Sequence, residues 1–101
     1  MKKVVPVAPP EPEILSPAMI GQAVRAARTR DGLRQADVAR MCGVSLQTLV
    51  DIEAGRPGVG IGLVLKVADR LGVRIFAFIG ADAYDIQDFL EQRKDAAGSE
   101  S

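Results

Sequence analysis

The sequence of 101 residues contains no histidine and only one cysteine, Cys42. These shortages remove most nucleophile–base pairs and most clusters that bind zinc, so we predict neither an enzyme nor a metal site. No phosphate-binding loop is visible either, and we predict no cofactor. A lone cysteine offers no disulfide framework, which is typical of a reducing cytosol.

Long apolar runs are also missing, and none of those present could span a bilayer. Lys2 and Lys3 precede only a short apolar stretch that is interrupted by Pro6, which argues against a signal peptide. We therefore expect a cytoplasmic protein without a membrane partner. Aromatic residues make up 4% of the chain and hydrophobic residues 48%. A core of one domain would consist of Ala, Val, Leu and Ile.

The chain has no net charge, but its charges are unevenly distributed. Residues 19–80 carry nine basic and five acidic side chains, whereas residues 81–101 carry two basic and six acidic ones. A net charge of zero argues mildly against a nucleic-acid partner. A local basic patch can still attract phosphates, because salt screens charges only beyond roughly 8 Å.

Residues 35–55, QADVARMCGVSLQTLVDIEAG, have the pattern of two short helices joined by a tight turn. The helices are predicted over residues 35–41 and 46–54. Gly43 lies where the reversal needs a left-handed backbone, and the Ser45 hydroxyl can cap the second helix.

On the second helix, Leu49 and Ile52 lie three residues apart and are predicted to be buried, so that other side chains face outward. The residues predicted to face outward are Leu46, Gln47, Val50 and Asp51. Two helices joined by a glycine turn indicate a helix-turn-helix motif, whose second helix fits the major groove of DNA.

Further segments flank this motif. Four prolines make residues 1–15 a disordered or extended arm. The helical domain is predicted over residues 16–72, with additional helices over residues 17–30 and 61–71. Their predicted inner stripes are Ile20, Ala23, Val24 and Ala27 in the first helix, and Ile61, Val64, Leu65, Ala68 and Leu71 in the last.

Residues 73–80 form an apolar run rich in β-branched and aromatic side chains, which suits a strand better than a helix. Because a lone strand has unpaired amides, we expect it to pair with the same strand of a second copy. The residues expected at this dimer contact are Val73, Ile75, Phe76, Phe78 and Ile79. The alternative is a fifth helix that continues the core. Residues 81–101 are predicted to form an acidic helix, over about 82–94, and a tail.

The segments AVRAARTRDGLRQ, GVS, QTLVDIEAG and LKVADRLGV, followed by RIFAFIG, resemble the lambda-repressor/Cro-like (XRE) helix-turn-helix family. Within it, the chain looks most like the HipB-type antitoxin repressors. The resemblance implies an all-α domain of four to five helices, with a short C-terminal strand that pairs across a homodimer. It also implies a repressor that binds double-stranded DNA at an inverted-repeat operator. A kinase-like toxin is a further implied partner.

The resemblance assigns Gln35 to a phosphate contact and to bracing of the recognition helix. It also makes Arg28 and Glu53 an internal ion pair. We expect Gln47 to read a base, because a glutamine amide pairs with adenine through two hydrogen bonds. Exposed arginines, including Arg40, are expected to contact phosphates. The predicted DNA-binding set is Arg34, Gln35, Ser45, Leu46, Gln47, Thr48, Val50, Asp51 and Arg56.

The chain departs from this family at several positions of that set. Polar or basic residues are common in the family where Leu46, Val50 and Asp51 stand here, and Arg34 replaces the usual Ser/Thr cap. A carboxylate facing DNA also repels phosphates. These departures leave a second hypothesis open, a protein-interaction adaptor or toxin-neutralising module with weak or no DNA binding.

Overall fold

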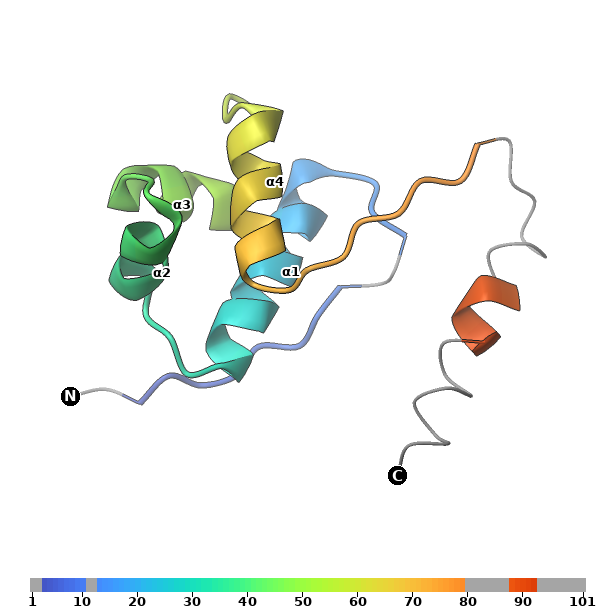
Figure 1. Ribbon diagram of the computed structural model, residues 1–101, viewed down its shortest axis with the longest axis horizontal. Coiled ribbons are helices and arrows are strands. Elements are labelled where there is room, and N and C mark those ends of the chain that lie inside the picture. The colour runs from blue at the N-terminus through green and yellow to red at the C-terminus, as the bar shows by residue number, and fades with distance from the viewer. Residues whose placement is uncertain (1–2, 11–12, 80–87, 93–101) are drawn as a thin grey trace.

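A computed structural model of the chain describes residues 3–10, 13–79 and 88–92. It contains four labelled helices, α1 (Pro17–Arg30), α2 (Gln35–Cys42), α3 (Leu46–Glu53) and α4 (Ile61–Arg70). Figure 1 shows these helices gathered into one body, from which residues 73–79 lead away towards a short helical segment at 88–92. The predicted all-α architecture, with two short helices joined by a glycine turn, is confirmed for the described residues. Within the described ranges, no helix has the length and apolar character needed to cross a bilayer.

Hydroxyl groups cap two of the helices. Ser16 Oγ accepts a hydrogen bond from the backbone N–H of Met19 at 3.3 Å, and Pro17 occupies the first turn of α1. Ser45 Oγ accepts from the N–H of Thr48 at 3.0 Å at the start of α3. Gly43 ends α2 with φ of 68°, a left-handed conformation that costs glycine little. The turn between α2 and α3 therefore has the local chemistry that was predicted from the sequence.

The core consists of small aliphatic side chains contributed by all four helices. Its largest fully buried members are Val24 from α1, Val38 from α2, Leu49 from α3 and Val67 from α4. The other buried members of this cluster are Ala27, Ala39, Cys42, Ile52 and Leu71. Helix α3 packs against both α1 and α2, and α2 also packs against α4. The core thus holds α3 from one side and leaves its other side uncovered.

Helices α1 and α3 approach each other closely at Gly21. A Cβ atom at this position would clash with the carbonyl oxygens of Ile52 and Glu53 at the end of α3. Gly21 is buried, and it lies within the helical part of α1, in its second turn. Since glycine in a helix costs about 0.5–1 kcal/mol relative to alanine, the close approach explains why this position carries no side chain.

The predicted inner face of α4 was partly wrong. Ile61 and Leu65 are 74% and 47% exposed, whereas Val67 is fully buried. The packed stripe of α4 is Val64, Val67, Ala68 and Leu71. Both stripes have helical spacing, because α4 is apolar around most of its circumference, so periodicity alone could not choose between them.

The predicted strand over residues 73–79 is absent. Residues 73–78 have no regular secondary structure, and the described part of the chain contains no strand. A strand is defined by ladder hydrogen bonds to a neighbour, and this segment finds no such neighbour among the described residues. The alternative of a fifth helix over these residues is also wrong. A helix does occur at 88–92, inside the predicted range of 82–94, whose remaining residues lie outside those described.

The proline-rich arm lies along α1 (Figure 1). The backbone N–H of Val7 donates to Thr29 Oγ1 at 2.9 Å, and Gln22 Nε2 donates to the carbonyl oxygen of Ala8 at 3.1 Å. Residues 3–10 have no helix or strand, and these two hydrogen bonds attach them to the helical body.

Candidate nucleic-acid interface

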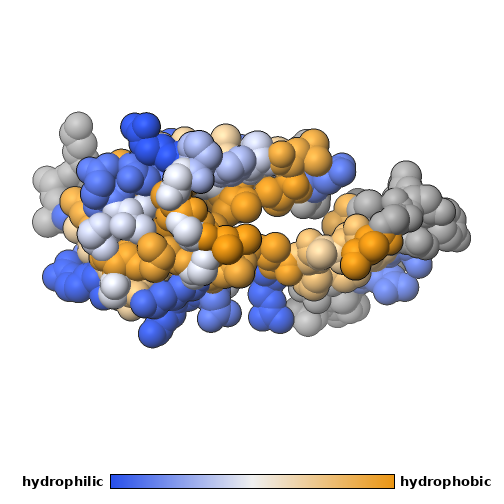
Figure 2. All heavy atoms as spheres, turned by 90° about the horizontal axis from the view of Figure 1, so that it is seen from above, coloured by the Kyte–Doolittle hydropathy of each residue, from blue (hydrophilic) through white to orange (hydrophobic). Residues whose placement is uncertain are grey.

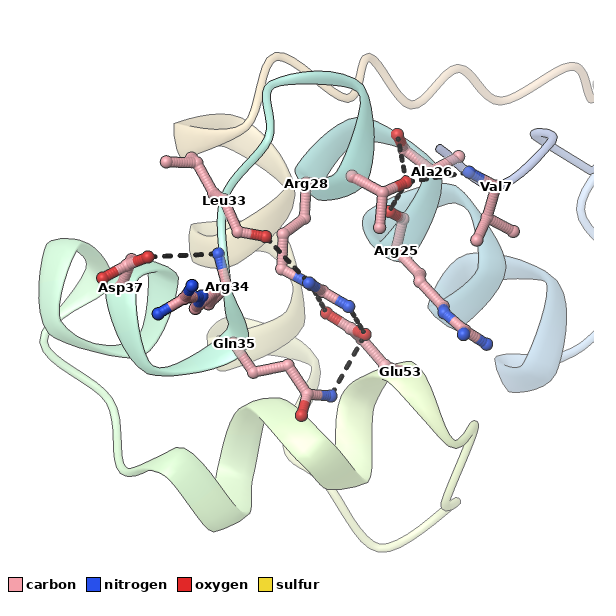
Figure 3. A network of polar contacts seen from close by, with 10 residues as sticks. Val7, Arg25, Ala26, Arg28, Leu33, Arg34, Gln35, Asp37 and Glu53 are labelled. Atoms are coloured by element: carbon pink, nitrogen blue, oxygen red, sulfur yellow. Dashed lines mark hydrogen bonds and ion pairs between the residues drawn. The ribbon is translucent and has the colours of Figure 1, made fainter. Parts of the chain in front are cut away.

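The carboxyl end of α3 is anchored by a buried ion pair between Arg28 of α1 and Glu53 of α3 (Figure 3). Arg28 Nε donates to Glu53 Oε2 at 2.6 Å, and Arg28 Nη2 donates to Glu53 Oε1 at 2.9 Å. The two side chains are only 9% and 5% exposed. Arg28 Nη1 also donates to the carbonyl oxygen of Leu33 at 2.8 Å, which ties the α1–α2 connection to the same guanidinium. This arrangement satisfies a buried charge with an opposite charge and several hydrogen bonds.

Gln35 joins this network from the first residue of α2 (Figure 3). Its Nε2 donates to Glu53 Oε1 at 3.2 Å, so Glu53 links α3 to both preceding helices. The Gln35 side chain is half-buried. Because it donates to the last residue of α3, it braces that helix directly. Its second amide N–H and its Oε1 do not take part in this contact.

Helix α3 carries several residues of the predicted DNA-binding set, including Gln47, the predicted base reader. Leu46 and Gln47 are exposed, and Thr48, Val50 and Asp51 are half-exposed. Gln47, Val50 and Asp51 lie on the side of α3 opposite to Leu49 and Ile52, which belong to the core. Leu46 and Thr48 lie on the two flanks of this outer face.

One side-chain hydrogen bond and one ion pair organise this face. Gln47 Nε2 donates to Asp51 Oδ1 at 2.9 Å, one helical turn further on. Asp51 Oδ1 also lies 3.1 Å from Nε of Arg56, which follows α3. The backbone N–H of Arg56 donates to the Asp51 carbonyl oxygen at 3.0 Å, so the arginine is held next to the acid. The negative charge of Asp51 is therefore accompanied by a positive charge.

The residues expected at phosphates lie around the start of α2 and of α3. Arg34 is exposed and precedes α2, where its own N–H donates to Asp37 Oδ2 at 3.1 Å. Arg40 is also exposed and pairs with Asp37 at 3.2 Å. An exposed pair such as Arg40–Asp37 is worth only about 0–1 kcal/mol, so Arg40 can exchange Asp37 for a phosphate. The contact of Arg34 with Asp37 is made by its backbone, so its guanidinium does not take part in that contact. Ser45 is occupied by Thr48, because its Oγ donates to Thr48 Oγ1 at 2.8 Å.

Sequence reasoning missed Lys66 of α4. Its Nζ lies 3.7 Å from where a Cβ on Gly43 would stand, so an exposed ammonium sits beside the α2–α3 turn. In the sequence, Lys66 could have been recognised by its position in α4, one residue before Val67, which is buried. The nearby Cys42 is buried, and burial raises the pKa of its thiol, while the charges of Arg70 and Lys66 act in the opposite direction. A neutral, packed thiol fits a core role rather than a reactive one.

A second surface is apolar and lies on the other side of α1 from α3. Residues 73–79 and the segment 88–92 face α1 and the arm across a groove of about 750 Å³. Hydrophobic side chains line both sides of the hollow seen in Figure 2. Members of this lining include Ile14, Leu15, Met19, Ile75, Phe76 and Phe78. The rings of Phe76 and Phe78 contact Phe89, with centroid separations of 5.0 and 5.5 Å.

Most of the residues predicted at the dimer contact expose apolar surface along this segment. Val73 is half-buried against the core, whereas Ile75, Phe76, Phe78 and Ile79 are all exposed. Ile79 reaches 98% exposure. Monomeric proteins rarely expose apolar side chains in one continuous stretch, and such patches mark interaction sites.

The sequence matches the family model for helix-turn-helix proteins over residues 24–78, which is more than half of the chain. A protein of Sinorhizobium fredii (strain NBRC 101917 / NGR234), the uncharacterized HTH-type transcriptional regulator y4mF, is 47% identical over 62 residues. That match covers 61% of this chain and 82% of the relative.

Solved structures with a similar fold include the HipB-O4 20mer complex and the HipA-HipB-O2-O3 complex. Each gives a TM-score of 0.61 at 19% identity, covering 68% of this chain and 97% of the other. A hypothetical transcription factor, NHTF from Neisseria, gives a TM-score of 0.57 at 27% identity and covers 72% of this chain and 83% of its own. At 19% identity, the likeness to the HipB chains concerns the fold alone.

Proposed function

The chain belongs to the helix-turn-helix family whose model spans residues 24–78, and on this premise we propose that it is a sequence-specific DNA-binding transcriptional regulator, acting as a repressor. In this proposal α3 is the recognition helix and lies in the major groove, which admits one α-helix. The observation that carries the proposal concerns α3. Its carboxyl end is fixed by the buried Arg28–Glu53 pair, while Gln47 on its outer face and Leu46 at the flank of that face are exposed.

Base reading is proposed to centre on Gln47. Its amide can donate and accept at the same time, which matches the N7 and N6 positions of adenine in the major groove. Leu46 offers an apolar contact to a thymine methyl group, and Val50 lies on the same face as the reader, with Thr48 at its flank. Asp51 completes the set through its contact with Gln47.

Phosphate contacts are proposed to come from the residues around α2. Arg34 and the free N–H of the Gln35 amide lie at the amino end of α2, where the helix dipole favours an anion. Ser45 stands at the amino end of α3, and Arg56 follows its carboxyl end. Such contacts set position and affinity without carrying sequence information.

The regulator is proposed to act as a homodimer, in which two copies place their α3 helices in half-sites of an inverted repeat about one helical turn apart. The exposed apolar side chains of residues 75–79 and the adjoining groove support this proposal. A second copy of the same segment, running antiparallel, would supply the ladder partner that the described residues of one chain do not provide.

Binding of a labelled duplex pool at two salt concentrations tests the proposed function. The affinity should fall steeply as salt rises, because each neutralised phosphate contributes about −0.9 to the slope of log K against log salt. Glutamine variants supply the specificity control. Gln47→Ala should reduce selectivity, whereas Gln22→Ala should not, because the amide of Gln22 holds the arm at Ala8. No binding even at low salt would refute the proposal.

A protein partner is the second candidate, and the apolar lining of the groove favours it. The net charge of zero and the acidic composition of residues 81–101 point the same way. One solved structure of similar fold is the HipA-HipB-O2-O3 complex, so a HipA-like, toxin-like partner is the specific form of this candidate. Co-purification of the chain with a kinase-like protein encoded beside it, without any DNA binding at low salt, would favour the adaptor over the repressor.

A further inference from the structure

The contact between Gln47 and Asp51 changes what the Gln47 amide can read. A glutamine amide has two N–H donors on Nε2 and one acceptor oxygen, Oε1. Asp51 Oδ1 accepts one of these N–H groups at 2.9 Å. The exposed side chain of Gln47 is therefore left with one N–H donor and one acceptor oxygen for a ligand.

The remaining donor and acceptor distinguish the two purines. Adenine presents an acceptor at N7 and a donor at N6, which match one N–H and one oxygen. Guanine presents two acceptors, N7 and O6, so bidentate recognition of guanine needs two donors. An amide whose first N–H is bonded to Asp51 can donate only one hydrogen bond to guanine. Its oxygen then faces the second acceptor of guanine, and two acceptors cannot form a hydrogen bond.

We propose that Asp51 is a positioning residue that restricts Gln47 to adenine and excludes guanine. This inference rests on the proposed DNA-binding function and specifies how the recognition helix selects a base. The two residues lie one turn apart on α3, where side chains four apart are neighbours. Asp51 does not need to touch DNA in order to act.

Arg56 makes a carboxylate at this position compatible with DNA. Its Nε lies 3.1 Å from Asp51 Oδ1, and its backbone N–H donates to the Asp51 carbonyl oxygen at 3.0 Å, which places the start of its side chain next to the acid. The pair is neutral overall, which reduces the repulsion of phosphates that an isolated carboxylate would cause. The same oxygen, Asp51 Oδ1, accepts the hydrogen bond from the Gln47 amide.

Two simpler roles for Asp51 make different predictions. If Asp51 only repels phosphates, Asp51→Ala should tighten binding to every sequence by the same factor. If Asp51 itself accepts a hydrogen bond from cytosine, its removal should change a base preference that persists when Gln47 is absent. A positioning role requires that the effect of Asp51 depends on Gln47.

The test uses the full chain and the duplex recovered by selection from random DNA. The base pair read by Gln47 is the one whose preference Gln47→Ala alters, and duplexes with adenine or guanine there are compared. We expect the wild-type chain to bind the adenine duplex about 10-fold or more tightly than the guanine duplex. Asp51→Ala should reduce this ratio to about 2-fold, and Asp51→Asn, which keeps an acceptor oxygen, should retain most of it.

A double variant decides the mechanism. When Asp51→Ala is added to Gln47→Ala, the ratio of the affinities for the adenine and guanine duplexes should not change. A uniform change on both duplexes, or an equal effect of Asp51→Ala with and without Gln47, would overturn the inference while the proposed function stands. Absence of binding by the wild-type chain would instead overturn the proposed function and the inference with it. Circular dichroism checks that each variant is folded, and Asp51→Leu repeats the measurement if Asp51→Ala is not.

Discussion

Arg28 Nε and Glu53 Oε2 are 2.6 Å apart, although the two residues are separated by 25 positions in the sequence. This contact connects the first helix of the domain to the last residue of α3. Because Gln35 donates to the same carboxylate, one acidic side chain sets the position of the helix that is proposed to enter DNA.

Removal of Glu53 should therefore be strongly destabilising. Glu53→Ala leaves the buried guanidinium of Arg28 without its counter-charge, and we expect the free energy of unfolding to fall by about 3–5 kcal/mol. The matched control is Asp31→Ala, which removes the acid of the exposed Arg30–Asp31 pair and should cost less than about 1 kcal/mol. Urea denaturation of both variants measures the difference. Similar losses for the two would contradict the structural role assigned to Glu53.

Two helical glycines should respond to alanine in opposite ways. Gly21→Ala places a methyl group against the carbonyl oxygens of Ile52 and Glu53 and should destabilise the fold by about 1–3 kcal/mol. Gly62→Ala lies in α4 with no atom within 4 Å of the added carbon and should stabilise it by about 0.5–1 kcal/mol. Thermal denaturation of both variants gives the sign of each change. A stabilising Gly21→Ala would show that α1 and α3 do not approach closely.

Cys42 should make stability depend on alkaline pH. Burial raises the pKa of its thiol above the ordinary value of 9.0, so the unfolded chain loses the thiol proton at a lower pH than the folded chain. The unfolded state then binds fewer protons, and the free energy of unfolding falls as the pH rises through the ordinary thiol pKa. Denaturation at about pH 7 and about pH 10, either side of that ordinary value, should show a larger fall for the wild type than for Cys42→Ala. Equal falls would mean that the thiol titrates normally in the folded chain.

The apolar segment beyond α4 should determine the oligomeric state. Phe76→Asp introduces a charge into the exposed stretch that lines the groove, and we expect it to convert a dimer into a monomer. Val5→Asp is the control, since Val5 is 72% exposed but does not line the groove. Sedimentation analysis across a range of concentrations reports the mass of each variant. A wild-type chain that stays monomeric throughout, or a Phe76→Asp variant that stays dimeric, would argue against this interface.

Local rules predicted the helices of the domain well. Ser16 and Ser45 cap α1 and α3, and Gly43 forms the left-handed end of α2, because these features depend on neighbouring residues alone. The face of α4 could not be predicted in the same way. Its apolar residues continue around the helix, and the choice of Val67 over Leu65 depends on tertiary packing.

Features that need a distant partner were harder to predict. The prediction of a strand over residues 73–79 was wrong for a single chain. A strand requires a neighbouring strand to bond with, and the described residues contain none. The contact between Gln47 and Asp51 could have been found from their spacing of four, which makes them neighbours on a helix. The attachment of Arg56 to Asp51 depends on how the chain turns after α3, and the sequence pattern contains no signal for it.

Selection of bound duplexes from random DNA, with the wild-type chain and with Gln47→Ala in parallel, tests most directly whether two copies of α3 read DNA. The account predicts that the wild type enriches inverted repeats with half-sites about one helical turn apart. It also predicts that Gln47→Ala loses the base preference at the same position of both half-sites. Recovery of no enriched sequence by the wild type, or of the same repeats by Gln47→Ala, would contradict it.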